Sequence, residues 1–214
     1  MLSIYDSQMS YIGKEDKKIV HQTGLWHKVF SGIMYNKNAK KIYFQTIYPK
    51  EAYTFERDDF IDFSVGGHIE DNEKVIDAGV REVAEELGLN INSNDLKFLG
   101  IRVCNCDLSD TYKVREFQHF YAFETTKYLK DMSFLSSDNE VKSVIEIDID
   151  KFLSLLVGDT NEISANEMIL DRNTREGTYS ENISITYKRI IPDYYKDKSI
   201  LEKFLAVKGL IDSI

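Results

Sequence analysis

The chain has 214 residues, enough for one well-buried domain with additions, and 43% hydrophobic and 29% charged residues are typical of a soluble globular protein. Its formal net charge of −9 argues against binding to a nucleic acid polymer, because such binding needs a basic surface. No apolar run follows a basic start, and no stretch approaches the ~18 apolar residues of a membrane span. We therefore expect a cytoplasmic protein without a membrane partner. Cys104 and Cys106 are interpreted as packing residues, because two cysteines make neither a disulfide framework nor a complete metal site.

Runs of β-branched and aromatic residues between turn signals predict most of the regular structure as strands. We expect strands at residues 17–21, 25–36, 41–47, 60–65, 95–106, 116–124 and 141–147. Apolar spacing and capping residues predict helices at 151–156, 164–170 and 199–211, with a loop at 171–182. The cap of the first of these is expected at Asp148 or Asp150. A further helix is expected between a cap at Asp71 or Asn72 and a stop at Gly88.

The helix before Gly88 carries three glutamates close together. At ~100° per residue, Glu82, Glu85 and Glu86 fall within ~100° of one another on the helix surface. The apolar residues of the opposite arc, which we expect to be buried, are Ile76, Val80, Val83, Ala84 and Leu87. Like charges at these spacings repel, so the cluster favours a bound Mg²⁺ or Mn²⁺, which prefers oxygen ligands. A solvated acidic face is the alternative.

The same stretch resembles the Nudix box, G-x5-E-x7-R-E-U-x-E-E-x-G-U, in which U is apolar. Every constrained position is filled, by Gly67, Glu73, Arg81, Glu82, Val83, Glu85, Glu86, Gly88 and Leu89. The resemblance implies an α/β protein with the Nudix-type α/β/α sandwich around a mixed β-sheet. It covers residues 25–157, which we expect to form a Nudix hydrolase domain. Residues 1–24 would then be an N-terminal extension and residues 158–214 a mainly helical C-terminal extension.

The resemblance also implies the roles of individual residues. The implied metal ligands are Gly66 through its carbonyl, Glu82, Glu85 and Glu86, with Glu116 and Glu140 as candidate carboxylates from later segments. The three box glutamates are also the candidate catalytic residues, one of which could act as general base. The residues with an implied structural role are Gly67, Glu73, Arg81 and Gly88, with Arg81 paired to Glu73. For Glu116 and Glu140, an exposed carboxylate without function is the alternative.

Segments 24–30 and 64–68 resemble the isopentenyl-diphosphate-isomerase-like branch of the Nudix proteins. In true isomerases a catalytic cysteine precedes the Gly-His pair, and here that position is Gly66, which argues against isomerase chemistry. Isomerases also bind a metal through histidines and a glutamate. The residues at roughly corresponding positions are His21, His27, His68 and Glu116, with the first two one residue closer together. A packed or surface imidazole is the alternative for each histidine.

These features leave three functions open. The leading one is a Mg²⁺-dependent hydrolase, with Mn²⁺ as a second option, that cleaves a phosphoanhydride bond in a nucleoside diphosphate-linked or related small molecule. The others are an isopentenyl-diphosphate-isomerase-like enzyme and a non-catalytic ligand-binding module, and the intact box favours an enzyme. Specificity is expected from loops at 49–59, 107–115 and 129–139, where Tyr53, Phe55 and Tyr112 could stack a base or simply pack. A homodimer is compatible with the resemblance.

Overall fold

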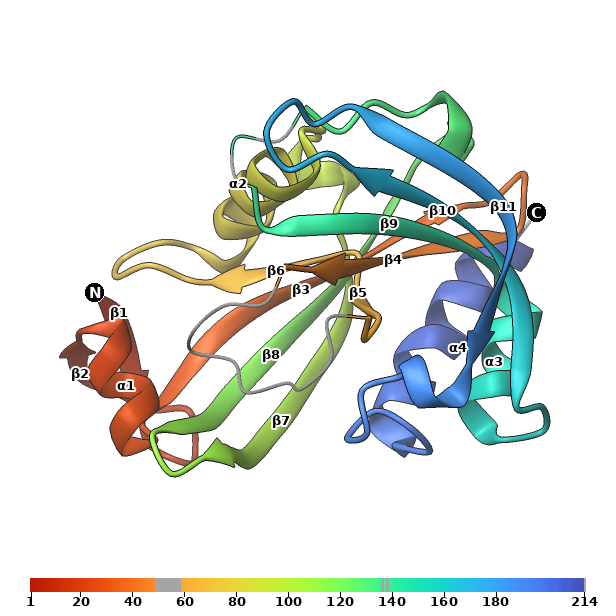
Figure 1. The fold of residues 1–214 in the computed structure, drawn as a ribbon. Helices are drawn as coiled ribbons and strands as arrows, with labels where there is room; N and C mark the ends of the chain where they lie inside the picture. Colours follow the sequence, from red (N-terminus) through yellow and green to blue (C-terminus); the bar gives the residue numbers. More distant parts are fainter. Residues whose placement is uncertain (49–58, 136, 138, 214) are drawn as a thin grey trace.

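The computed structural model describes residues 1–48, 59–135, 137 and 139–213, and within them eleven strands form one mixed sheet (Figure 1). The strands are β1 Leu2–Tyr5, β2 Tyr11–Glu15, β3 Trp26–Asn36, β4 Lys41–Ile47, β5 Asp62–Phe63, β6 Val65–His68, β7 Lys97–Ser109, β8 Tyr112–Glu124, β9 Val141–Asp148, β10 Glu162–Leu170 and β11 Gly177–Thr186. The helices are α1 Lys17–Thr23, α2 Val75–Leu87, α3 Ile149–Val157 and α4 Lys198–Asp212. Short 3-10 turns lie at Ser93–Asp95, Leu129–Asp131 and Tyr187–Arg189. The expected loop at 49–59, with Tyr53 and Phe55, lies outside the described residues except for residue 59.

The sheet is mixed because a parallel pair lies inside an otherwise antiparallel arrangement. Its main path runs β11-β10-β9-β4-β3-β1-β2, and the long strand β8 pairs parallel with β3 and antiparallel with β7. β6, which carries the Gly-Gly-His segment, pairs antiparallel with β3. This pairing places the start of the Nudix box beside the middle of the sheet.

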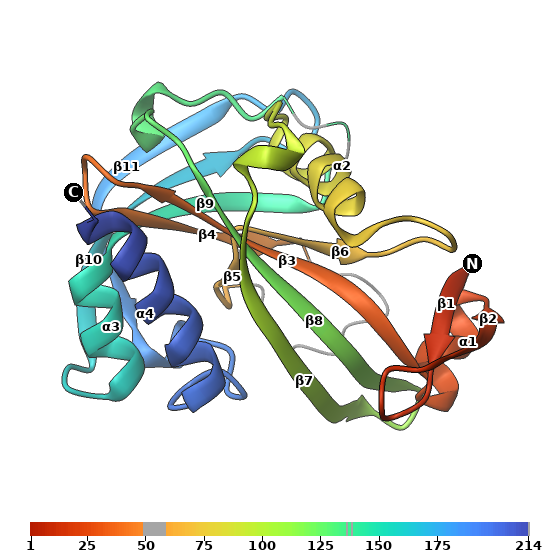
Figure 2. The same cartoon turned by 180° about the vertical axis from the view of Figure 1, so that it is seen from behind.

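Both faces of β3 are buried, and this defines two helical layers. Alternate residues of a strand point to opposite faces, so Ile33 and Tyr35 join one core cluster while Phe30 and Met34 join another. The first cluster includes residues of α3 and α4, and the second includes residues of α2. Figure 2 shows α2 and the α3–α4 pair as separate layers. The predicted α/β/α sandwich around a mixed sheet is therefore confirmed.

Residues 17–23 form helix α1, so the strand expected at 17–21 is wrong. The carboxylate of Asp16 caps the helix by accepting a backbone N–H at 2.9 Å, and Gly24 ends it with a left-handed φ of 75°. The helix is short, but it buries His21 against the sheet. Two flanking caps and one buried face thus override the β-propensity of the segment.

The box helix α2 begins later than the sequence suggested. Its N-cap is Lys74, which makes no side-chain capping hydrogen bond, so the cap expected at Asp71 or Asn72 is wrong. Those two residues lie in the loop before the helix. The expected stop is confirmed, because Gly88 has a φ of 65° and donates its N–H to Ala84 at 3.1 Å.

The C-terminal segment contains two strands as well as a helix. The helix expected at 199–211 is confirmed as α4, but the helix expected at 164–170 is strand β10, and β11 begins inside the expected loop at 171–182. The error arises because the apolar residues Ala165, Met168 and Ile169 have the i, i+3, i+4 spacing of a helix face. In the strand, a register shift between Ala165 and Glu167 places the buried residues at 163, 165, 168 and 170, and Ile169 is exposed. β10 pairs with β9, so the sheet continues past residue 157, and the division into a domain and two extensions stays a prediction.

Other elements agree closely with expectation. Asp148 caps α3 by accepting the N–H groups of Asp150 and Lys151. The strand expected at 60–65 is split into β5 and β6 at Ser64, whose buried hydroxyl donates to the Tyr43 carbonyl at 2.6 Å. No helix in the described part of the chain is both long enough and apolar enough to cross a membrane.

Candidate active site

A cleft of about 460 Å³ opens between α2, β3, β6, β7 and β8. The predicted site residues that line it are Gly66, Gly67, His68, Arg81, Glu82, Glu85, Glu86, Glu116 and Glu140. Glu73 and Gly88 lie outside the lining. The fold therefore gathers the candidate metal ligands of the box and of the later segments around one space.

The glutamates of α2 do not share an exposed face. Glu82 and Glu86 are only 8% and 5% exposed, whereas the Glu85 side chain is 42% exposed. The residues that α2 buries are Ala78, Gly79, Glu82, Val83, Glu86 and Leu87, so the expectation that the carboxylates lie opposite the buried arc is wrong for two of the three. The reason is that α2 lies against the glycines of β6, which leave room for acidic side chains beneath the helix.

Gly67 is the residue that makes this room. A Cβ at position 67 would coincide with the carboxylate group of Glu82, so the absence of a side chain is a requirement for the observed packing. Glu86 is held by neutral donors instead. Its Oε2 accepts the Gly66 backbone N–H and the Gln45 side-chain amide, both at 3.1 Å. Two buried carboxylates are thus seated on the Gly-Gly segment.

Arg81 links the loop of the Nudix box to its helix, and it makes the expected pair with Glu73. Its Nε and Nη2 donate to the two Glu73 oxygens at 2.9 and 3.0 Å, and Nη2 also donates to the His68 carbonyl at 3.0 Å. Its Nη1 donates to Glu82 at 2.8 Å and to Glu85 at 2.9 Å. One guanidinium is therefore shared among three carboxylates, and hydrogen bonding to it holds the pKa of Glu73 below its usual value.

Burial dominates the electrostatics of Glu82. It raises the pKa of this carboxyl to about 7, against the opposing effect of the neighbouring Arg81. A carboxylate in this position is an anion that lacks full compensation from protein cations. The site is therefore suited to a further positive charge.

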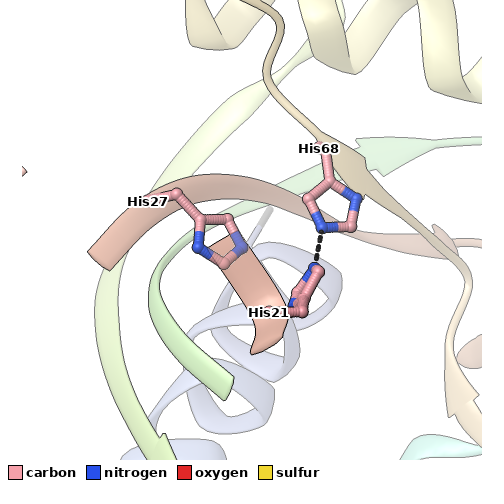
Figure 3. Close-up of side chains that lie close together, drawn as sticks. All are labelled: His21, His27 and His68. Atoms are coloured by element: carbon pink, nitrogen blue, oxygen red, sulfur yellow. Dashed lines mark hydrogen bonds between the residues drawn. The ribbon is translucent and has the colours of Figure 1, made fainter. Parts of the chain in front are cut away.

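Three histidines form a second cluster in the structure (Figure 3). Their ring nitrogens all lie within 4.8 Å of one another, and this is the one such group of three that the described residues form. His21 comes from α1, His27 from β3 and His68 from β6. The Nε2 atoms of His21 and His68 are 2.9 Å apart. The histidines that correspond in sequence to the metal ligands of the isomerases therefore lie together in the structure. His21, for which a packed imidazole was the alternative, belongs to this cluster.

The outer nitrogens of two of these rings are fixed by backbone carbonyls. Nδ1 of His27 lies 3.0 Å from the Leu25 oxygen, and Nδ1 of His21 lies 3.3 Å from the Lys113 oxygen. A carbonyl can only accept, so each Nδ1 carries the proton and each Nε2 presents a lone pair. Burial lowers the pKa of His27 to about 4, and burial next to His27 also lowers the pKa of His21. Neutral imidazoles of this kind are the form that binds metals.

His27 Nε2 is buried, and no hydrogen-bond partner for it exists among the described residues. The nearest acidic group is Glu116, whose Oε1 lies 3.7 Å away. Burial raises the pKa of Glu116, and its other oxygen accepts from Gln118 at 3.0 Å. Gln118 in turn accepts from Arg102, which pairs with Asp197 at 2.9 Å. The carboxylate that completes the histidine cluster is therefore held by a hydrogen-bonded chain that reaches the C-terminal segment.

Gly66 has more free space around it than Gly67 has. A Cβ there would meet only the Phe30 carbonyl oxygen, at 3.6 Å, so a side chain could enter the cleft. The thiols of the cleft come from Cys104 and Cys106 of β7, whose sulfurs lie 4.0 Å apart. Both thiols stay protonated, since burial raises their pKa values, that of Cys106 to about 12.

Sequence reasoning missed the part of the cleft that the C-terminal segment supplies. Asp193 and Tyr194 line it beside Asp62 of β5, and the Tyr194 hydroxyl donates to Asp62 at 3.3 Å. Burial raises the pKa of Asp62 to about 6. Of the expected specificity residues, Tyr112 does line the cleft, where it stacks on His21 at 4.3 Å. No local motif marks Tyr194, because its role depends on a contact across 132 positions.

Comparisons with known proteins agree with this geometry. A family model described as NUDIX domain matches residues 26–165. An uncharacterised Nudix hydrolase of Clostridium acetobutylicum is 29% identical over 176 residues, which cover 81% of this chain and 82% of that protein. A crystal structure from Deinococcus radiodurans superposes with a TM-score of 0.50 at 16% identity, over 73% of this chain and 88% of that one, and shares the fold alone. Because the matched residues include most of the sheet and the whole box, the chain belongs to the NUDIX family of hydrolases.

Proposed function

We propose that this Nudix enzyme uses Mg²⁺ or Mn²⁺ to cleave the phosphoanhydride bond of a small diphosphate compound. The observation that carries the proposal is that the buried carboxylates of Glu82 and Glu86 pack against Gly67 and Gly66 at the wall of the cleft. Arg81 is shared among three carboxylates, and Glu86 is held by neutral donors. A buried acidic group of this kind gains most from a divalent cation with oxygen ligands.

The residues that would hold this cation are Glu82, Glu85, Glu86 and the Gly66 carbonyl, with Glu140 from the segment before β9, which also lines the cleft. When bound, the metal would lower the pKa of water and neutralise charge on the phosphoryl oxygens. The protein's own part is to position carboxylates around the substrate and to accept the proton of the attacking water. Glu85, the most exposed of the box glutamates, and Glu140 are the candidates for that base, since neither is seated on the glycines.

The histidine cluster supports a second metal position beside the cleft, whose lining includes His68 and Glu116. Its ligands would be His21, His27, His68 and Glu116. Three neutral imidazoles and a carboxylate match the preferences of Zn²⁺ and of other first-row transition metals. The unpartnered Nε2 of His27 supports this assignment, because a buried acceptor without a donor is costly unless a ligand satisfies it.

The ligand class that suits this cleft is a small-molecule diphosphate. Eight carboxylates but only two basic side chains, Lys17 and Arg81, are among the residues that line the cleft, so a diphosphate would be held mainly through bound cations. A nucleoside diphosphate linked to another group is the substrate type that we expect. Neither a nucleic acid polymer nor a membrane is part of the proposal, and a cytoplasmic location stays a prediction.

An isopentenyl-diphosphate-isomerase-like activity is the second candidate. The observation in its favour is the histidine–glutamate cluster, and the one against it is Gly66, which supplies no thiol to the cleft. Cys104 faces Glu116 across the β7–β8 pair, so a thiol and a carboxylate do lie on neighbouring positions.

One screen separates these functions. Purified protein is incubated with dinucleoside polyphosphates, nucleotide sugars, ADP-ribose and isopentenyl diphosphate in the presence of Mg²⁺ or Mn²⁺, and products are followed by ³¹P and ¹H NMR. We expect cleavage of at least one diphosphate by the wild type and none by Glu86→Gln. Isomerisation of isopentenyl diphosphate without phosphate release would overturn the hydrolase proposal. Metal binding without turnover across the panel would favour a ligand-binding module.

A further inference from the structure

The C-terminal segment forms one wall of the active-site cleft. Asp193 and Tyr194 line the cleft together with Asp62 and Phe63 of β5. Both residues of the C-terminal segment lie beyond residues 26–165, which match the family model. This wall is therefore separate from the Nudix box, and it can influence the choice of substrate rather than the chemistry that the box supports.

Tyr194 is held in one orientation by its neighbours. Its ring centroid lies 4.9 Å from that of Phe63 and 5.4 Å from the guanidinium carbon of Arg102, which is fixed in turn by Asp197 at 2.9 Å. The Tyr194 hydroxyl donates to Oδ1 of Asp62 at 3.3 Å. Burial raises the pKa of Tyr194 well above its usual value, so the proton stays on the tyrosine. The hydroxyl is thus committed as a donor to Asp62, and its oxygen keeps lone pairs that can accept a hydrogen bond.

Asp62 presents an acceptor to the cleft. Its Oδ1 accepts the Phe63 N–H at 2.7 Å as well as the Tyr194 hydroxyl. Within the described residues no group donates to Oδ2, and Oδ2 is not one of the buried side-chain atoms that lack a partner. Because Asp62 lines the cleft, its Oδ2 is open to that space. A donor from a bound molecule would complete the hydrogen bonding of this carboxylate.

Asp62 also lies close to the glutamates of the box. In the antiparallel pair of β4 and β5 it stands directly opposite Gln45, and such opposed side chains lie on one face with Cβ atoms ~4.5–5.5 Å apart. Gln45 donates to Glu86 at 3.1 Å. One side chain therefore separates Asp62 from a candidate metal ligand. An organic group attached to a diphosphate at Glu86 lies within reach of Asp62.

The charges around Asp62 decide which kind of group fits. Burial raises the pKa of Asp62 to about 6, and the charged neighbours that act on it are Glu116 and Arg102, with opposite effects. The basic residues of the lining, Lys17 and Arg81, come from α1 and α2 rather than from this wall. A second anionic group would be repelled here, and a hydrocarbon would leave Oδ2 without a donor. An uncharged hydrogen-bond donor avoids both costs.

We propose that Asp62 and Tyr194 determine substrate specificity by binding hydroxyl groups of a sugar that the substrate carries on its diphosphate. Oδ2 of Asp62 accepts from one hydroxyl, and the phenolic oxygen of Tyr194 accepts from another. The inference rests on the proposed cleavage of a small diphosphate. It favours a sugar-bearing diphosphate over isopentenyl diphosphate, whose hydrocarbon chain has no donor.

The test compares two diphosphonates, in which a methylene group replaces the bridging oxygen so that neither is cleaved. One is the methylene analogue of ADP-ribose, which carries sugar hydroxyls, and the other is methylenediphosphonate, which carries no organic group. Calorimetric titration of the full chain with Mg²⁺ present gives both affinities. For Asp62→Asn we expect a fall of ~10–100-fold for the ADP-ribose analogue, the size expected for one hydrogen bond to a charged group. Methylenediphosphonate should bind as it does to the wild type, which also shows that the site is folded.

The design of Asp62→Asn follows from the contacts of Asp62. Phe63 and Tyr194 both donate to Oδ1, so the amide oxygen takes that position and the amide NH₂ turns toward the cleft, where a donor replaces an acceptor. Tyr194→Phe keeps the ring and removes the hydroxyl, and we expect a fall of ~3–10-fold for the ADP-ribose analogue. The matched control is Tyr195→Phe, because Tyr195 is outside the lining of the cleft.

Three results would overturn the proposal. One is a wild type that binds the ADP-ribose analogue no more tightly than methylenediphosphonate, and another is unchanged affinity of Asp62→Asn for the analogue. The third is an equal loss of affinity for both probes in Asp62→Asn, since Asp62 would then act on the diphosphate or its metal. These affinities need no turnover, so a hydrolysis screen without cleavage would refute the hydrolase and leave the sugar-binding result to stand or fall by itself.

Discussion

The Nε2 atoms of His21 and His68 lie 2.9 Å apart, although 47 positions separate the two residues. Two neutral imidazoles at this distance need either a shared proton or a shared cation. His21 is oriented by the Lys113 carbonyl, and His27 joins the pair with a buried Nε2. The helix α1, which carries His21, is therefore joined to the Gly-Gly-His segment by a contact between two imidazole nitrogens as well as by packing.

His27→Ala should remove the second metal position. Substitutions of residues that only support metal ligands lower metal affinity by ~10–100-fold. Because His27 would be a ligand itself, we expect the affinity for Zn²⁺ or Mn²⁺ to fall by more than that. Equilibrium dialysis with metal analysis by mass spectrometry measures the affinity and the stoichiometry. The matched control is His119→Ala, because His119 is also buried and has an unpartnered Nε2 but lies outside the cluster. Equal metal binding in both variants would refute the assignment.

Glu86→Gln should lower turnover by orders of magnitude while the fold is kept. The substitution preserves shape, and the amide oxygen can still accept from Gly66 and Gln45, but the charge needed to hold the cation is lost. A loss of several kcal/mol of transition-state stabilisation corresponds to a fall of ~10²–10³-fold in kcat. Asp77→Asn is the control, since Asp77 is an exposed carboxylate in the first turn of the same helix. Steady-state kinetics on a substrate from the screen decides the outcome.

Gly67→Ala and Gly66→Ala should behave differently, although they add the same methyl group to adjacent residues. At position 67 the new Cβ would displace the Glu82 carboxylate, and overpacking of this kind costs ~1–3 kcal/mol. At position 66 the nearest atom would be 3.6 Å away, which is ordinary contact. Urea unfolding and kinetics should show a damaged Gly67→Ala and a nearly unchanged Gly66→Ala. Similar stability and kinetics of the two variants would contradict the close packing of the Glu82 carboxylate against Gly67.

The metal-free protein should lose stability as the pH rises. Burial raises the pKa of Glu82 from 4.5 to about 7, so the folded state binds this proton more tightly than the unfolded state does. Its contribution is therefore most favourable below pH 4.5 and is lost between pH 4.5 and 7. The upper limit is ~3 kcal/mol, because the pKa of the carboxyl rises from 4.5 to about 7.

Glu82→Gln should remove this part of the pH dependence. Urea unfolding at pH 5 and pH 8 with a chelator present measures the pH dependence of the free energy of unfolding. At pH 8 the variant should be more stable than the wild type. Saturating Mg²⁺ should restore the wild type at pH 8 and have little effect on the variant, because metal binds the ionised carboxylate. A wild type whose chelated form is equally stable at both pH values would show that Glu82 is not buried as an anion.

Local features of this chain were predictable from its sequence. The stop of α2 at Gly88, the cap of α3 at Asp148 and the strands β3 and β4 depend on residues within a few positions of one another. The error at α1 is local too, because Asp16 and Gly24 are caps that the sequence displays. The error at β10 is of another kind, since the apolar residues at 165, 168 and 169 have a helical spacing and only the pairing with β9 and β11 makes the segment a strand.

The family can be recognised from the amino-acid sequence, because the Nudix box is a continuous motif whose spacing places glycines, arginine and glutamates on one loop and helix. The burial of that helix depends on the folded chain, because Gly67 makes room for Glu82 across a contact that helical periodicity does not contain. The convergence of His21, His27 and His68, and the completion of the cleft by Asp193 and Tyr194, also depend on the fold. These contacts join distant positions, and the pairing of strands in the sheet sets them rather than local conformational preference.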